Sequence, residues 1–177
     1  MNNTSDIGFG DTAAGIRVYI ARRPPMAEYA ELTQLKQLQS GEVTLINSAC
    51  GNGWRKVFNV YAKLLFAVDT KQFAFTRQAA SWQQYRDRRL LQAGSDTALL
   101  FSIPQLLPRV NTVHIIAGRT YAKALLDAGL TVQLSWLNNE FAIDKFNRVL
   151  VCPYFDYRQL NNEKLVYLAQ LIRTLDE

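Results

Sequence analysis

The sequence predicts an α/β protein, a three-layer α/β/α sandwich with a mostly parallel central sheet. Short, almost continuous apolar runs are typical of strands that are buried on both faces, as parallel strands are. Segments with helical spacing of apolar residues separate these runs, and right-handed crossovers then place helices on both faces of the sheet. The chain of 177 residues, 49% hydrophobic and 20% charged, is long enough for one domain with a substantial core. We expect a flexible leader at residues 1–15, which are small and polar, and a single domain at residues 16–177.

In the first half of the domain, local signals delimit the strands and helices. Pro24 and Pro25 follow the first strand and prevent a helix from starting early. Gly41 ends a segment in which leucines recur at helical spacing, and Ser81 is a suitable N-cap for a later helix. The predicted strands are residues 16–21 and 43–46, a loop follows at 47–53, and the predicted helices are residues 27–39, 54–68 and 81–92.

The second half shows the same alternation with clearer boundaries. Pro104 stops one apolar run, and Gly118 and Gly129 flank a helical segment. Asn161 can cap the last helix, which has leucines along one face. The predicted strands are residues 97–103, 112–117, 131–137 and 147–151, and the predicted helices run from Gly118 to about residue 128 and over residues 162–175.

Composition and charge exclude several classes of protein. No apolar run approaches the roughly 20 residues that a transmembrane helix needs, and the first residues lack the pattern of a secretion signal. The two cysteines, Cys50 and Cys152, predict reduced thiols and a cytoplasmic location. One histidine, His114, is too few for the usual histidine metal sites, so we expect no metal and no cofactor. A net charge of +5 permits an anionic partner, and we expect no membrane partner.

Ligands of parallel sheets bind at the carboxyl ends of the strands, which directs attention to the loops there. Residues 47–53 contain glycines that allow close backbone approach, and this loop leads into a helix that begins with an aromatic and a basic residue. A tight turn with cations on a helix surface is the alternative explanation. Gly118, Arg119 and Thr120 form a second strand-to-helix turn that can face a phosphate or be an ordinary surface.

The third loop, residues 152–162, combines aromatic, acidic, basic and amide side chains between a buried strand and the last helix. Its aromatic residues cannot all face one core, so we expect at least one to face solvent or a ligand, where it can stack on a base. The candidate ligand-binding residues are Gly51, Gly53, Trp54, Arg55, Arg119, Thr120, Tyr154, Phe155, Tyr157, Arg158 and Asn161, and the catalytic candidates are Asn47, Asn52, Cys152 and Asp156.

Residues 73–89 form a further basic and aromatic segment. The segment holds several arginines together with Phe73, Phe75, Trp82 and Tyr85. Such a mixture is either a surface for phosphates and bases or a packed helix. His114 lies within an apolar run and is expected to be a core residue.

Three segments, residues 52–57, 113–119 and 149–154, have an order that resembles the uracil-DNA glycosylase-like superfamily over about the last 130 residues. The resemblance implies an α/β/α domain with a parallel sheet and a groove for a nucleobase or nucleic acid, with Arg119 and Arg158 near its edges. Cys152 stands where the family has the histidine that stabilises the departing base, and Tyr154 stands where serine is expected. Residues 47–53 also lack the aspartate that many members direct toward water, for which Asn47 or Asn52 can substitute only as an orienting amide. A thiol is a poor substitute for an imidazole donor, which argues against ordinary uracil excision.

The sequence therefore favours a nucleic-acid or nucleobase-binding protein with altered or absent catalysis. One alternative is a small-molecule enzyme or a nucleotide- or phosphate-binding protein that uses the same crevice. As an enzyme, the protein would hydrolyse an N-glycosidic bond or a nucleotide-like substrate. The other alternative is an interaction module without chemistry.

Overall fold

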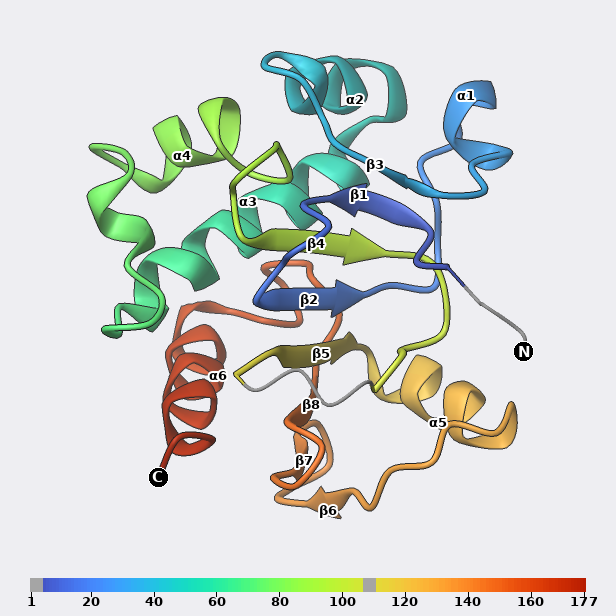
Figure 1. Cartoon of the computed structure of the whole chain (residues 1–177), viewed down its shortest axis with the longest axis vertical. Coiled ribbons are helices and arrows are strands. Elements are labelled where there is room, and N and C mark those ends of the chain that lie inside the picture. Colours follow the sequence, from blue (N-terminus) through green and yellow to red (C-terminus); the bar gives the residue numbers. More distant parts are fainter. Residues whose placement is uncertain (1–4, 107–110) are drawn as a thin grey trace.

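The computed structural model describes residues 5–106 and 111–177, which form a single eight-stranded mixed sheet with helices around it (Figure 1). The strand order is β3-β1-β4-β2-β5-β8-β7-β6. The four central strands, β4, β2, β5 and β8, pair in parallel, whereas β1 is antiparallel to β4, and β7 is antiparallel to both β8 and β6. The strands are β1 Gly8–Gly10, β2 Ile16–Tyr19, β3 Leu35–Lys36, β4 Thr97–Leu100, β5 Val113–Ala117, β6 Ser135–Trp136, β7 Ala142–Asp144 and β8 Val149–Cys152.

The α/β class is therefore confirmed, and the sheet is mixed because antiparallel strands flank its parallel centre. The helices are α1 Ala27–Ala30, α2 Glu42–Cys50, α3 Asn52–Val68, α4 Trp82–Arg88, α5 Arg119–Asp127 and α6 Asn162–Thr174, and a 3-10 turn spans Phe75–Arg77.

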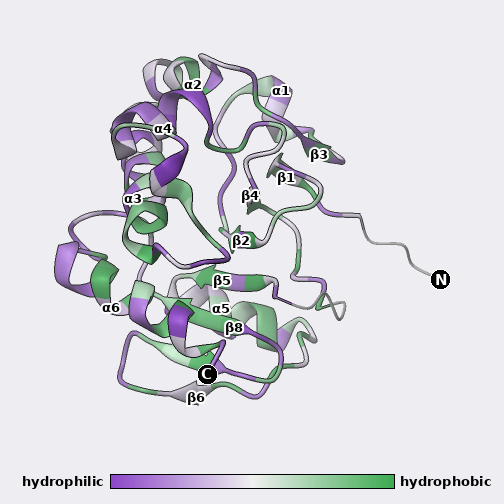
Figure 2. Ribbon diagram, turned by 60° about the vertical axis from the view of Figure 1, so that its left-hand side comes forward, coloured by the Kyte–Doolittle hydropathy of each residue, from purple (hydrophilic) through white to green (hydrophobic). Residues whose placement is uncertain are grey.

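Alternation along the central strands divides the core into two clusters on opposite faces of the sheet. Val18, Ile115 and Leu150 belong to the larger cluster, together with the apolar faces of α3 and α6. Their neighbours Tyr19 and Ile116 belong to the smaller cluster, which includes residues of α5. Helices thus lie on both faces, and Figure 2 shows β8 and most of β5 as hydrophobic ribbon, in keeping with strands covered on both sides.

The segment at residues 1–15 differs from the predicted flexible leader, because residues 8–10 form β1 within the sheet. The Phe9 ring is buried, with edge-to-face contacts to Tyr29 and Phe101. Gly8 and Gly10 allow β1 to lie against β4 so closely that a Cβ on Gly8 would be 2.2 Å from the Leu99 carbonyl oxygen. A single aromatic residue between two glycines does not show the alternation of apolar and polar side chains that predicts a strand, and the sequence therefore did not predict β1.

The predicted helix at residues 27–39 is wrong beyond Ala30, where α1 ends. The Arg23 guanidinium donates to the carbonyl oxygens of Tyr29, Ala30 and Leu32 at distances of 3.3, 3.0 and 2.8 Å. These hydrogen bonds satisfy the carbonyl groups at the end of α1 that further helical turns would otherwise satisfy. Leu35–Lys36 then pairs with β1 as β3.

The predicted strand at 43–46 and the first residues of the loop at 47–53 are both helical, because α2 spans Glu42–Cys50. Val43 and Ile46 are both buried, and a spacing of three places them on the same face of a helix. A short apolar segment of this length also suits a strand that is buried on both faces, so the sequence did not distinguish the two. The Glu42 carboxylate accepts from the Gln39 amide at 2.8 Å and from Lys36 at 3.0 Å, which stabilises the first turn.

The remaining predicted elements occur with somewhat different bounds, and most of them are shorter than predicted. Only Ser135–Trp136 of residues 131–137 is a strand, and β7 was not predicted at all. The Ser81 and Asn161 caps are confirmed, since their side chains accept from the amides of Gln84 and Lys164 at 3.1 and 3.0 Å. Helix α3 matches its prediction closely, and the Tyr61 hydroxyl anchors it to the sheet by donating to the Ala98 carbonyl at 2.8 Å.

We predict that Gly8→Ala lowers the free energy of unfolding by about 2–3 kcal/mol, because the added methyl group would collide with the backbone of β4. Urea unfolding measures the difference. Gly53→Ala is the matched control, since Gly53 is helical with open space around its Cα, and there the free energy should stay unchanged or rise by up to about 1 kcal/mol. Equal stability of Gly8→Ala and the wild type would show that β1 does not lie against β4.

Candidate functional site

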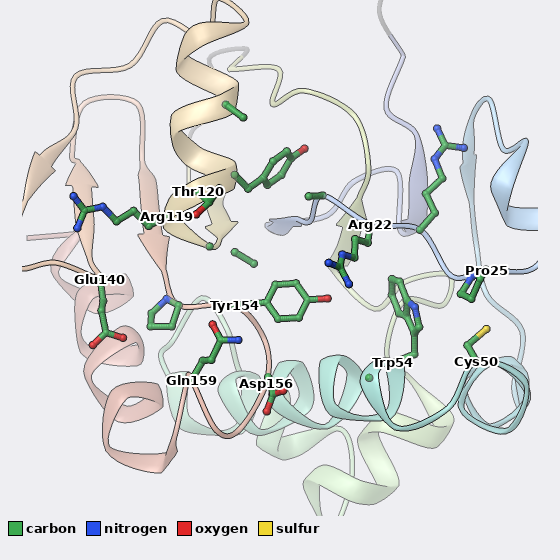
Figure 3. A pocket seen from close by; sticks show the side chains of 18 of the residues that line it. Arg22, Pro25, Cys50, Trp54, Arg119, Thr120, Glu140, Tyr154, Asp156 and Gln159 are labelled. Carbon is green, nitrogen blue, oxygen red and sulfur yellow. The ribbon is translucent and has the colours of Figure 1, made fainter.

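A pocket of about 1190 Å³ lies at the carboxyl ends of β2, β5 and β8 (Figure 3). The residues that follow these strands form much of its wall, namely Arg22 after β2, Gly118 after β5 and Pro153 after β8. The register explains this meeting, because Ala117 at the end of β5 pairs with Cys152 at the end of β8. The pocket is therefore a consequence of parallel strands that end together.

Among the aromatic side chains of the pocket wall, Tyr154 and Trp54 come from different elements. Tyr154, in the loop after β8, is half-buried and extends across the cavity with its hydroxyl toward Arg22 (Figure 3). Trp54, in the first turn of α3, lies on the far side and is 7% exposed. Burial raises the pKa of Tyr154, while the charge of Arg22 opposes this rise. The phenol is thus neutral near pH 7, and it presents both a ring and a hydrogen-bonding hydroxyl.

Of the three arginines in the pocket wall, two are held by the protein itself. Arg23 donates to three backbone carbonyls and lies 5.7 Å from the centre of the Phe101 ring. Arg119 donates to the Asn139 carbonyl at 2.8 Å and points away from the pocket centre (Figure 3). Arg22 has no hydrogen bond or ion pair with residues 5–106 and 111–177. Its guanidinium points into the pocket and is available to a ligand (Figure 3).

The two carboxylates in the wall are neutralised by neighbouring cations. Asp156 accepts from Arg158 Nη2 at 3.0 Å and lies 3.5 Å from Lys56 Nζ. The hydrogen bond from the Arg158 side chain is the main reason that the pKa of Asp156 falls to about 2, and the charges of Arg158 and Lys56 lower it further. The other carboxylate, Glu140, forms an ion pair with Lys164 at 2.8 Å. Asp156 is consequently ionised but weakly basic, which is unfavourable for a general base.

The first turn of α5 adds polar groups to the wall. Thr120 lines the pocket, and the helix begins at Arg119 directly after Gly118, whose φ of 109° suits glycine (Figure 3). The first amides of a helix have no acceptor within the helix, and the helix dipole favours an anion there. This turn therefore adds to the attraction of Arg22 for an anion.

Six of the residues selected from the sequence line the pocket, and the rest do not. Those in the wall are Gly53, Trp54, Arg119, Thr120, Tyr154 and Asp156. Those outside it are Asn47, Gly51, Asn52 and Arg55 around the α2–α3 junction, and Cys152, Phe155, Tyr157, Arg158 and Asn161 around β8 and the loop that follows.

Several residues outside the wall are buried or make contacts within the protein. Cys152 is fully buried and its burial raises the pKa of the thiol, so this side chain is no nucleophile. Phe155 is fully buried with an edge-to-face contact to Tyr61. Lys56 lies 5.1 Å from the centre of the exposed Tyr157 ring, and Asn161 caps α6.

Sequence reasoning missed several residues of the wall. Arg22 directly follows the predicted strand at 16–21, so the same strand-end argument that selected Arg119 would have found it. Asn139 and Glu140 enter from the β6–β7 hairpin, which the sequence did not predict. Cys50, Gly118, Pro153 and Gln159 lie in the loops that the sequence singled out, although they were not among the site candidates. The residues outside those loops are Ala21, Arg22, Arg23, Pro25, Ala117, Tyr121, Ala124, Asn139 and Glu140.

The segment at residues 73–89 is packed rather than open. Phe73, Phe75 and Tyr85 are buried in the core. Trp82 lies between two cations, with Lys63 and Arg86 at 5.0 and 5.5 Å from its ring centre. The aromatic side chains of this segment are therefore occupied by contacts within the protein.

The part of the chain that the structure describes contains no candidate metal site and no helix suited to span a membrane. No group of three or more histidine, cysteine, aspartate or glutamate side chains there is arranged to hold a metal ion. None of the helices in residues 5–106 and 111–177 has the length and hydropathy to cross a bilayer.

Comparison with known proteins identifies a family without assigning an activity. A family profile matches residues 7–173, so the chain belongs to the family described as "Family of unknown function (DUF6942)". A search of curated proteins and a search of solved structures each found no match.

We predict that Asp156→Asn lowers the free energy of unfolding at pH 7 by about 1 kcal/mol, after allowance for solvent screening of its ion pairs. Because the pKa of Asp156 is lowered from 3.8 to about 2, its contribution is complete above pH 4 and is lost as the pH falls toward 2. Urea unfolding of both proteins at pH 7 and at the lowest pH that keeps them folded measures this. A difference that does not shrink on acidification would contradict the assignment.

Proposed function

We propose that this member of the DUF6942 family is a nucleic-acid or nucleobase-binding protein whose pocket accepts a base beside Tyr154 and Trp54. The observation that carries the proposal is the meeting of these two aromatic side chains in one pocket with the guanidinium of Arg22, which has no partner among the described residues. Aromatic rings stack on any base, and arginine supplies the charge for an adjacent phosphate. A volume of about 1190 Å³ also leaves room for a sugar-phosphate next to the base.

The resemblance to the uracil-DNA glycosylase-like superfamily supports the same function. The four central strands are parallel, and the pocket lies at the carboxyl ends of three of them, in keeping with the layout that the resemblance implies. The segments that carry the resemblance contribute Trp54, Arg119 and Tyr154 to the wall.

The chemistry of the pocket favours binding over cleavage of an N-glycosidic bond. Cys152, at the position of the family's histidine, is buried, and its thiol cannot stabilise a departing base anion. His114 is on β5, where its Nδ1 lies 2.7 Å from the Tyr19 hydroxyl, and it is outside the pocket wall. With Asp156 and Glu140 both in ion pairs, the wall offers an ionised carboxylate of low basicity and no imidazole.

A free nucleotide or sugar phosphate is the second candidate ligand. The observation that favours it is the first turn of α5, with Thr120, on the same pocket as Arg22. The proposal includes a cytoplasmic location, which suits the free thiols of Cys50 and Cys152.

We predict that Tyr154→Ala weakens binding of a labelled single-stranded oligonucleotide about tenfold, because stacking on one ring is lost, and that Tyr154→Phe retains most of the affinity. Fluorescence anisotropy at low salt measures the affinities. Failure of the wild-type protein to bind oligonucleotides at low salt, together with an unchanged melting temperature in the presence of nucleotides, would exclude the proposed function.

Arg22→Ala should also weaken binding and should make it less dependent on salt, by about one unit in the slope of log affinity against log salt. Arg88→Ala is the matched control, because Arg88 is an exposed arginine on α4 and lies outside the pocket wall. Its affinity and salt slope should equal those of the wild type. Nucleotides that raise the melting temperature of a protein unable to bind oligonucleotides would favour the second candidate.

A further inference from the structure

A large aromatic side chain remains exposed next to the pocket, on the hairpin formed by β6 and β7. Trp136 is 39% exposed and lies in β6, the edge strand of the sheet. The Arg119 guanidinium lies over its ring, with Cζ 5.0 Å from the ring centre. Arg119 also lines the pocket, so Trp136 contacts a residue of the pocket wall.

The arrangement around Trp136 is held in place by hydrogen bonds and an ion pair. Arg119 Nη1 donates to the Asn139 carbonyl at 2.8 Å, which fixes the guanidinium against the hairpin. The Asn138 side chain accepts from the amides of Glu140 and Phe141 at 2.8 and 2.9 Å and so shapes the hairpin loop. Glu140 in turn pairs with Lys164 of α6. The ring and the guanidinium are therefore preorganised before any ligand binds.

The guanidinium retains donors that the protein does not use. Apart from the bond from Nη1 to Asn139, its N–H groups have no hydrogen-bond acceptor among residues 5–106 and 111–177. Arginine that stacks on an aromatic ring by its face keeps its edge free to donate to a phosphate. Arg119 can thus contact a phosphate while it remains over Trp136.

We propose that Trp136, supported by Arg119, is a second base-stacking position, and that the ligand of the pocket is a single-stranded nucleic acid of at least two adjacent nucleotides. One base lies beside Tyr154, the phosphate that follows lies at Arg119, and the neighbouring base stacks on Trp136. Bases in a duplex have their faces covered by neighbours, so a ring available for stacking selects a single strand. This inference rests on the proposed function, and it adds the length and the strandedness of the ligand.

The experiment compares a ligand that reaches only the pocket with one that reaches both positions. Thymidine monophosphate is measured by calorimetry and a labelled thymidine tetranucleotide by fluorescence anisotropy. Trp136→Ala should weaken binding of the tetranucleotide about tenfold and leave that of the mononucleotide unchanged. Trp136→Phe should recover most of the lost affinity, because a smaller ring still stacks.

Two further variants make the result specific. Trp136→Leu keeps an apolar side chain beneath Arg119 but removes the aromatic ring, and it should lose as much affinity as the alanine variant, even if the latter folds poorly. Phe146→Ala is the matched control, because Phe146 is 94% exposed and precedes β8, at the end of that strand opposite the pocket. Its affinity for the tetranucleotide should not change.

The possible failures distinguish this inference from the proposed function. Unchanged tetranucleotide binding by Trp136→Ala and Trp136→Leu would overturn the second position and leave the pocket proposal intact. Equal losses for the mononucleotide and the tetranucleotide would show that Trp136 supports the pocket rather than a second base. Absence of binding of both ligands to the wild type would overturn both proposals.

Discussion

The parallel pairing of β2, β5 and β8 is the constraint on which the pocket depends. Hydrogen bonds along these strands fix their register, so that the residues after Tyr19, Ala117 and Cys152 meet at one edge of the sheet. Each strand is buried on both faces, and slippage by one residue would move every side chain to the opposite face, against the other core cluster. The site is thus held in place by the same burial that stabilises the core.

Within this frame, charge pairing decides what the pocket can do. The carboxylates of Asp156 and Glu140 and the guanidinium of Arg119 are held by neighbouring groups, whereas Arg22 is left without a partner among the described residues. The pocket therefore offers a ligand the guanidinium of Arg22 and aromatic side chains that include Tyr154 and Trp54, while Asp156 is a poor proton acceptor. These properties suit recognition of a base and its phosphate better than bond cleavage.

Part of the wall depends on short elements outside the parallel centre of the sheet. The β6–β7 hairpin contributes Asn139 and Glu140, and ion pairs and hydrogen bonds to α5 and α6 hold it against the pocket. These contacts place Trp136 against Arg119, which lines the same pocket as Tyr154. The flanking strands thus extend a site that the central strands begin.

The sequence alone determined the α/β class, the long helix α3, the caps at Ser81 and Asn161, and the strand-end turns that hold Arg119 and Tyr154. These features follow from local periodicity, capping chemistry and the rule that ligands bind at strand ends. Tertiary structure decided the rest. Strand β1 depends on its close approach to β4. Helix α1 ends where the Arg23 side chain donates to the carbonyl oxygens at its C-terminus. Residues 42–50 form α2 because Val43 and Ile46 are buried on one helical face, which their short apolar segment did not reveal. Asp156 has a partner close in the sequence, Arg158, but its second cation, Lys56, is brought to it only by the folded chain, and only the folded chain leaves Arg22 without a partner among the described residues.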